Sequence, residues 1–168
     1  MWYKFAKTGI SEEDLNRELK DRIRKDMFFH RLFDDYGVSL DTIDNHLQFH
    51  IAELKDRHAH SKGEDIYLSN NLFSDGKFFD ESLHFVVHEL THWLTRMREK
   101  ISYFTDPEEI EAFTLGMTFE MLRGKSEQDI MSIFFPIIQG ETNDPENAKK
   151  LFKSLLAKAK LRLKRFSN

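Results

Sequence analysis

Residues 79–100 read FDESLHFVVHELTHWLTRMREK, and this stretch decides the fold around it. It contains neither glycine nor proline, and charged residues crowd both of its ends. Its apolar residues recur at the spacing of a helix that buries one face. They are Leu83, Val86, Val87, Leu90, Leu94 and Met97. The pattern predicts one long helix, preceded by a turn at Asp75-Gly76.

The centre of this helix carries the pattern H-E-x-x-H, formed by His88, Glu89 and His92. Residues four apart on a helix lie on the same face, so the two imidazoles can aim at one point. Such a pair supplies two ligands to Zn²⁺. Glu89 is placed to reach a metal-bound water as general base without binding the metal. The motif therefore predicts hydrolytic zinc chemistry, provided that a third ligand exists.

The residues after the motif narrow the choice of third ligand. A metzincin needs Gly and His at positions that Thr95 and Arg98 occupy here. Peptide deformylase uses a cysteine, and the chain has none. A carboxylate from a second helix remains as the candidate.

A second helix is predicted over residues 107–123, with Asp106 suited to its N-cap. Glu108 and Glu109 fall in its first turn, where carboxylates favour the helix dipole. Glu111 lies deeper, among small and apolar neighbours, where an unpaired carboxylate is costly. We therefore expect Glu111 to be the third ligand, followed by Glu108, with Glu109 last.

These residues resemble the gluzincin-type zincins, whose third ligand is a Glu on the helix after the H-E-x-x-H helix. The resemblance implies zinc ligands at His88, His92 and Glu111, with Glu89 as base. It covers about residues 64–122. Thermolysin-like members place an Asp where this chain has Leu115. In size the chain resembles compact stand-alone zincins, including the repressor-cleaving peptidases of mobile genetic elements.

Other residues have possible roles beside this motif. Tyr103, between the two predicted ligand helices, is a candidate to stabilise an oxyanion, although a purely structural tyrosine is an equal alternative. His84 shares a face with His88 and could contact substrate or hold a ligand in place. His58 and His60 fall in a polar stretch that we interpret as a solvated loop.

The rest of the chain predicts an α+β fold that is mostly helical, with a small sheet beside the metal helix. Helices are expected over about 11–36, shortly after Ser39, and over 107–123, 127–139 and 145–165. Strands are expected at 47–51 and 65–69, and we expect residues 65–71 to form an edge that binds extended peptide. We predict a single zincin-like domain, 1–168.

Composition sets further bounds on the class of protein. Sixteen phenylalanines can supply much of a core, and the absence of cysteine excludes disulfides and fits a reducing compartment. No apolar run approaches a membrane span, and the first residues do not resemble a signal peptide. We therefore expect a cytoplasmic protein without a membrane span.

The C-terminal helix is strongly basic. The last 24 residues hold eight Lys or Arg against one acid, Glu146. An apolar stripe runs along the same segment, so we expect the helix to dock with its lysines outward. A basic face for an acidic partner, a membrane surface or nucleic acid is the alternative, and nucleic acid ranks low because no binding motif is present.

The sequence thus predicts a zinc-dependent endopeptidase that acts on proteins or peptides with Zn²⁺ as cofactor. One alternative is a metal-binding regulatory protein of zincin fold that has little proteolytic activity. Another is a helical bundle in which the motif occurs by chance and binds no metal.

Overall fold

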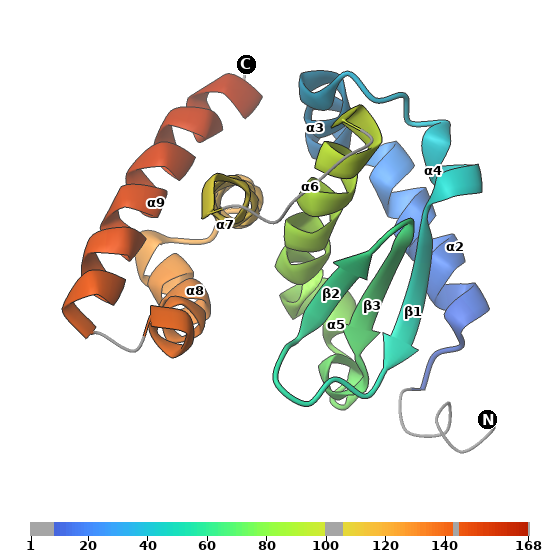
Figure 1. Ribbon diagram of the computed structural model, residues 1–168, viewed down its shortest axis with the longest axis horizontal. Helices are drawn as coiled ribbons and strands as arrows, with labels where there is room; N and C mark the ends of the chain where they lie inside the picture. The colour runs from blue at the N-terminus through green and yellow to red at the C-terminus, as the bar shows by residue number, and fades with distance from the viewer. Residues whose placement is uncertain (1–8, 100–105, 143–144, 168) are drawn as a thin grey trace. The chain divides into compact units, whose positions relative to one another are not determined.

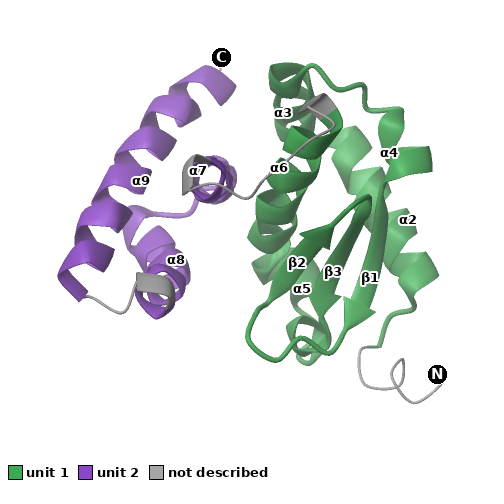
Figure 2. Ribbon diagram, in the orientation of Figure 1, with its two compact units in different colours: residues 1–103 green, residues 104–168 purple. Residues whose placement is uncertain are grey.

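The computed structural model describes residues 9–99, 106–142 and 145–167. These residues are mostly helical and include a three-stranded sheet, which confirms the predicted α+β class (Figure 1). The chain divides into two compact units, residues 1–103 and 104–168 (Figure 2). The single domain predicted for 1–168 stays a prediction, and each unit is described by itself.

The first unit begins with two helices, α2 (Glu12–Lys25) and α3 (Met27–Tyr36), where the sequence predicted one. The break is at Asp26, whose backbone is extended and whose carboxylate accepts a hydrogen bond from the Phe28 N–H at 2.8 Å. An Asp side chain favours this capping arrangement over a helix interior. Asp26 therefore ends α2 and starts α3, although the apolar spacing continues across it.

The sheet of the first unit has the strand order β1-β3-β2. Strand β1 (Gln48–Ala52) follows the short helix α4 (Thr42–His46) and pairs with β3 (Asp65–Ser69) in parallel. Strand β2 (Ala59–Lys62) pairs with β3 in antiparallel register through a tight turn. Gly63 has a left-handed backbone in that turn, with φ of 61°, which favours glycine.

Two predictions for this region are wrong. The polar stretch predicted as a loop forms β2, because Ala59 and Ser61 are buried while His60 and Lys62 are more exposed. This alternation is typical of a half-buried strand. As a result β3 is the central strand, and residues 65–71 do not form the sheet edge. Strand β2 takes that position.

Side chains of α2 occupy the outer edge of β1. The Asn16 amide donates to the Phe49 carbonyl at 2.7 Å and accepts from the Phe49 N–H at 2.8 Å. One turn earlier, the Glu12 carboxylate accepts from the Ile51 N–H at 3.0 Å. These two α2 side chains therefore take the hydrogen bonds that a further strand would make.

The Asn16 contact gives a stability prediction. Asn16→Ala leaves the N–H and C=O of buried Phe49 without these partners, and each such group costs about 1–3 kcal/mol. We expect the free energy of unfolding to fall by at least this amount in urea titrations. Glu13→Ala, at an exposed position on the same helix, is the control and should change stability by less than about 0.5 kcal/mol. Equal stability of the two variants would contradict the assigned role of Asn16.

The predicted helix over 79–100 is also divided. The short 3₁₀ helix η1 (Asn70–Phe73) comes first and is followed by helix α5 (Phe78–Glu81). Helix α5 ends at Ser82, and α6 (Leu83–Glu99) begins directly after it. The centre of α6 is buried in the core of the first unit. Its buried apolar residues are Leu83, Val86, Val87, Leu90, Trp93 and Leu94. The Trp93 indole N–H also donates to the His46 carbonyl at 2.9 Å, which ties α6 to α4.

The second unit consists of three helices, α7 (Asp106–Leu122), α8 (Glu127–Thr142) and α9 (Pro145–Phe166). Helix α8 continues through Pro136 and beyond its predicted end at residue 139. One apolar cluster joins the three helices, and its α9 members are Ala148, Phe152, Leu155 and Ala159. The expected docking of the apolar stripe of α9 is thus confirmed within this unit.

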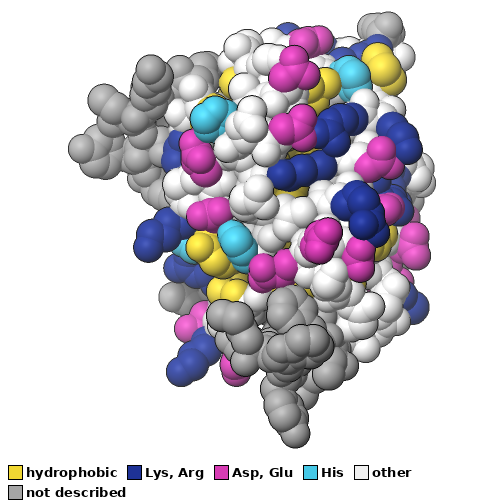
Figure 3. Space-filling model, turned by 90° about the vertical axis from the view of Figure 1, so that its right-hand side faces the viewer, with side chains coloured by type: hydrophobic (Ala, Val, Ile, Leu, Met, Phe, Trp, Pro, Cys, Tyr) yellow, Lys and Arg dark blue, Asp and Glu magenta, His cyan; other side chains and the backbone are white. Residues whose placement is uncertain are grey.

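Charges on the first unit are mixed rather than segregated. Figure 3 shows the side of α2, α4 and β1, where acidic and basic side chains alternate and apolar ones form only small groups. Ion pairs such as Arg22–Glu18 and Lys25–Asp21 contribute to this pattern. This face therefore offers no broad basic field for nucleic acid. Among the described residues, no helix is long and apolar enough to cross a membrane.

Candidate metal centre

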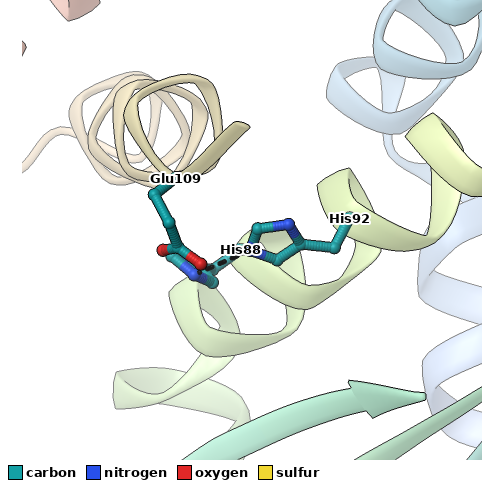
Figure 4. A group of neighbouring side chains, drawn as sticks. All are labelled: His88, His92 and Glu109. Atoms are coloured by element: carbon teal, nitrogen blue, oxygen red, sulfur yellow. Dashed lines mark hydrogen bonds between the residues drawn. The ribbon is translucent and has the colours of Figure 1, made fainter. Parts of the chain in front are cut away.

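Helix α6 brings His88 and His92 together, as their spacing predicts. Their Nε2 atoms lie 3.2 Å apart and are joined by a hydrogen bond, with the ring planes at 68° (Figure 4). His92 is buried and His88 is half-buried. Both imidazoles therefore direct the same nitrogen to one region beside the helix.

The spacing of these nitrogens fits a zinc ion. Zn–N bonds of about 2.0–2.1 Å at tetrahedral angles place two nitrogen ligands about 3.3 Å apart. The observed 3.2 Å separation is close to this value. The two imidazoles therefore need little rearrangement to become ligands.

The surrounding structure holds α6 in place. The buried apolar residues of α6 pack in the core of the first unit. In addition, the Arg96 guanidinium donates through Nε to the Gly63 carbonyl at 3.2 Å. This bond ties the last turns of α6 to the turn between β2 and β3. A pair of histidines on a packed helix is held more rigidly than a pair on a loop.

Glu89 is largely buried next to His88, with 8% of its surface exposed. Its charge acts on His60 of β2, where it raises the pKa against the larger lowering effect of burial. Glu89, the predicted general base, is thus close enough to β2 to interact electrostatically with His60. The sequence does not reveal this neighbourhood of Glu89, because the polar stretch that contains His60 resembles a loop.

His84 has a different environment from His88 and His92, which are on the same face of the helix. It is buried, and its ring lies 4.2 Å from the Phe85 ring, which in turn lies 4.7 Å from His58. Burial lowers the pKa of His58, and the neighbouring His84 lowers it further. Among the described residues, the group with metal-binding potential contains His88 and His92 but not His84. His84 therefore belongs to an aromatic cluster at the start of α6.

In the second unit, one acidic side chain of α7 forms an ion pair with α9. Glu111, the expected third ligand, pairs with Arg162 of α9, whose Nη2 donates to its Oε1. This ion pair uses the carboxylate that the sequence assigned to the metal. It weighs against Glu111 as a ligand.

Glu109 lies on the opposite side of α7 from Glu111, because two helical residues differ by about 200° around the axis. Its carboxylate therefore lies on the side of α7 away from the Glu111–Arg162 ion pair, and Figure 4 labels Glu109 together with His88 and His92. Glu108 is buried and Glu109 is half-buried. Since Glu109 belongs to the second unit, its role as ligand is a proposal.

The remaining predicted site residue, Tyr103, lies outside the described residues. Its role as oxyanion donor stays a prediction. The described part of the candidate site therefore contains two possible ligands, His88 and His92, and the predicted base Glu89.

No family model matches the chain, and searches of curated proteins and of solved structures also give no match. The functional interpretation therefore rests on the residues of α6, β2 and α7.

Proposed function

We propose that the protein is a zinc-dependent peptidase with a zincin-like arrangement of sheet and metal helix. The observation that supports this most is the 3.2 Å separation of the His88 and His92 Nε2 atoms. A largely buried Glu89 stands directly beside the first of them. A site that served structure alone has no need of such a base.

The proposed ligands are His88, His92 and Glu109. Two imidazoles and one carboxylate form the donor set of many catalytic zinc sites, which keep a fourth position for water. Glu109 replaces Glu111 in this proposal because Arg162 already engages the Glu111 carboxylate.

Zinc in such a centre supplies Lewis-acid chemistry and lowers the pKa of a water molecule. Glu89 would accept a proton from that water and then transfer it to the leaving amine, as a general base and acid. The Glu89 carboxylate suits this role because it adjoins His88 without belonging to the donor set.

The proposed substrate is an extended peptide that pairs with the outer edge of β2. The Ser69 N–H donates to the His58 carbonyl at 2.8 Å. Hydrogen-bonded pairs alternate along an antiparallel ladder, so Ala59 and Ser61 direct their N–H and C=O groups away from β3. Added strands bind through such outward groups. At the other edge of the sheet, Glu12 and Asn16 already take the outward groups of β1.

Metal content tests the proposed ligands. We expect one zinc ion per chain in the wild type, retention in Glu111→Ala, and loss in Glu109→Ala and His92→Ala, each measured by elemental analysis after dialysis. Retention in Glu109→Ala with loss in Glu111→Ala would restore the assignment made from the sequence. A wild-type protein that takes up no zinc would overturn the proposed function.

The second candidate is a metal-binding regulatory protein that acts through α9. The observation in its favour is the row of exposed lysines on α9, among them Lys149, Lys153 and Lys158. Such a face could attract an acidic partner. Hydrolysis that depends on both zinc and Glu89 would favour the peptidase instead.

A further inference from the structure

An open groove of about 600 Å³ lies between α8 and α9 in the second unit. Its apolar lining consists of Met131 and Phe135 of α8 and of Phe152 and Leu156 of α9. The two residues of each pair are four positions apart, so they lie on one face of their helix. Met131 is 47% exposed and is one of three large apolar side chains with such exposure among the described residues. The second unit thus leaves part of an apolar strip unburied.

Two contacts between the helices define the length of this groove. The Lys160 ammonium of α9 pairs with the Glu127 carboxylate at the start of α8. Further along, the rings of Phe135 and Phe152 meet edge to face with their centroids 5.9 Å apart. Eight residues forward on α8 therefore correspond to eight residues back on α9, and the two helices are antiparallel. Eight residues span about 12 Å of helix, close to the roughly 10.5 Å between residues i and i+7 of a partner helix.

The rim of the groove on the α9 side is basic. Lys149 and Lys153 line it, and both side chains are exposed. Lys149 pairs with Glu146 at 3.2 Å, and exposed pairs of this kind contribute little to stability. Lys153 forms no ion pair with another described residue. This side of the groove can therefore engage carboxylates of a partner.

The rim on the α8 side does not cancel this positive charge. The Glu127 carboxylate is already engaged by Lys160, and Gln128 is neutral. The groove thus has an apolar lining, one basic side and one side of little net charge. Its electrostatic complement is a surface with apolar side chains along its middle and acids along one flank.

The open shape of the groove favours a helix over a small molecule. Pockets for small ligands bury about 70–90% of the ligand surface, whereas Met131 at the wall of this groove stays half exposed. A membrane surface is bound by apolar side chains that protrude, and here they line a groove between two helices. An amphipathic helix inserts side chains at i, i+4 and i+7 into such a groove.

We propose that the groove between α8 and α9 binds an acidic amphipathic helix of a partner protein. Apolar residues of the partner contact Met131, Phe135 and Leu156, while its Asp or Glu side chains face Lys149 and Lys153. The flexible thioether of Met131 suits this role because it adapts to partners of different shape. The site lies within the second unit and does not depend on the proposed zinc chemistry.

Selection from two displayed peptide libraries tests the chemistry of the partner. Both libraries fix apolar residues at i, i+4 and i+7. One carries Asp or Glu at the flanking positions, and the other carries Lys or Arg there. The immobilised chain of residues 1–168 is expected to enrich the acidic library and not the basic one. Fluorescence anisotropy then gives the Kd of an enriched, fluorescein-labelled peptide, which should rise with ionic strength because exposed charges are screened.

Two variants locate the bound peptide, and each has a matched control. Met131→Glu places a negative charge in the groove and should raise the Kd by at least about tenfold. Lys153→Glu reverses a charge on the rim and should raise it by about fivefold. Met27→Glu changes another exposed methionine, on α3, and Lys158→Glu changes an exposed lysine about 140° around α9 from Lys153. Both controls should leave the Kd unchanged, and circular dichroism should show that all four variants are folded.

Equal enrichment of the two libraries, or an unchanged Kd in Met131→Glu, would overturn the proposal. Phosphatidylserine vesicles, oleate and a second copy of the chain are the other occupants to be tested. Binding of any of these that Met131→Glu abolishes, without enrichment of acidic peptides, would also overturn it, because the groove would then have a different occupant.

Discussion

Glu89→Gln is expected to lower peptide hydrolysis by about 10²–10⁴-fold, the usual contribution of general acid–base catalysis. The substitution preserves the size of the side chain and removes its ability to accept a proton. Because Glu89 lies outside the proposed donor set, zinc content should remain at the wild-type level. Initial rates with a quenched-fluorescent peptide, chosen from a degenerate library by zinc-dependent cleavage with the wild type, and elemental analysis of the same samples measure both effects.

Glu81→Gln provides the control, since Glu81 is an exposed acid on α5. It should cleave at the wild-type rate, and thermal melting should show that both variants are folded. Equal cleavage by Glu89→Gln and wild type would refute the proposed mechanism even if zinc were bound. A rate that fell together with zinc content would instead place Glu89 among the groups that hold the metal.

Leu155→Asp is expected to unfold the second unit or to lower its free energy of unfolding by more than about 3 kcal/mol. Leu155 is 1% exposed and belongs to the apolar cluster of α7, α8 and α9. The substitution removes this buried side chain and places a carboxylate there. Leu161→Asp is a matched control on the same helix, because Leu161 is 68% exposed. It should change stability by about 0.5 kcal/mol or less.

The same variant tests whether residues 1–168 unfold as one domain. Residues 104–168 contain neither Trp nor Tyr, whereas Trp93 is buried in the first unit. Far-UV circular dichroism follows the helices of both units, and indole fluorescence follows the first. If Leu155→Asp shifts both urea transitions together, the two units form one cooperative domain. A fluorescence transition that stays at its wild-type midpoint would show that they unfold independently.

The features that the sequence predicted best are those with local causes. The apolar spacing around His88 and His92 specifies a helix, and a helix alone places two residues four apart on one face. The helices of the second unit begin near predicted residues because proline, acids and caps mark helix starts. The strands around Phe49 and Ile66 also follow from alternation of buried and exposed residues.

The features that the sequence did not reveal have two kinds of cause. Some depend on local signals that compete with the apolar or polar pattern, and others depend on contacts between residues far apart in the chain. Asp26 and Ser82 interrupt apolar patterns that continue across them, so spacing alone could not show the breaks. Strand β2 is only four residues long, and its polar composition resembles a loop. The environment of Glu111 depends on Arg162, 51 residues away, which no local pattern reveals.

The hydrogen bonds from α2 to β1 have a consequence for self-association. Polymerisation through sheets requires two open edges on every molecule, so that each copy can join one neighbour on each side. In the described part of the chain, Asn16 and Glu12 occupy one edge, which leaves β2 as the only place where another copy can add. Growth by strand addition would stop at a dimer, and that dimer would compete with peptide for the same strand. Protection against fibre formation and a single edge for the proposed peptide substrate thus have one structural origin.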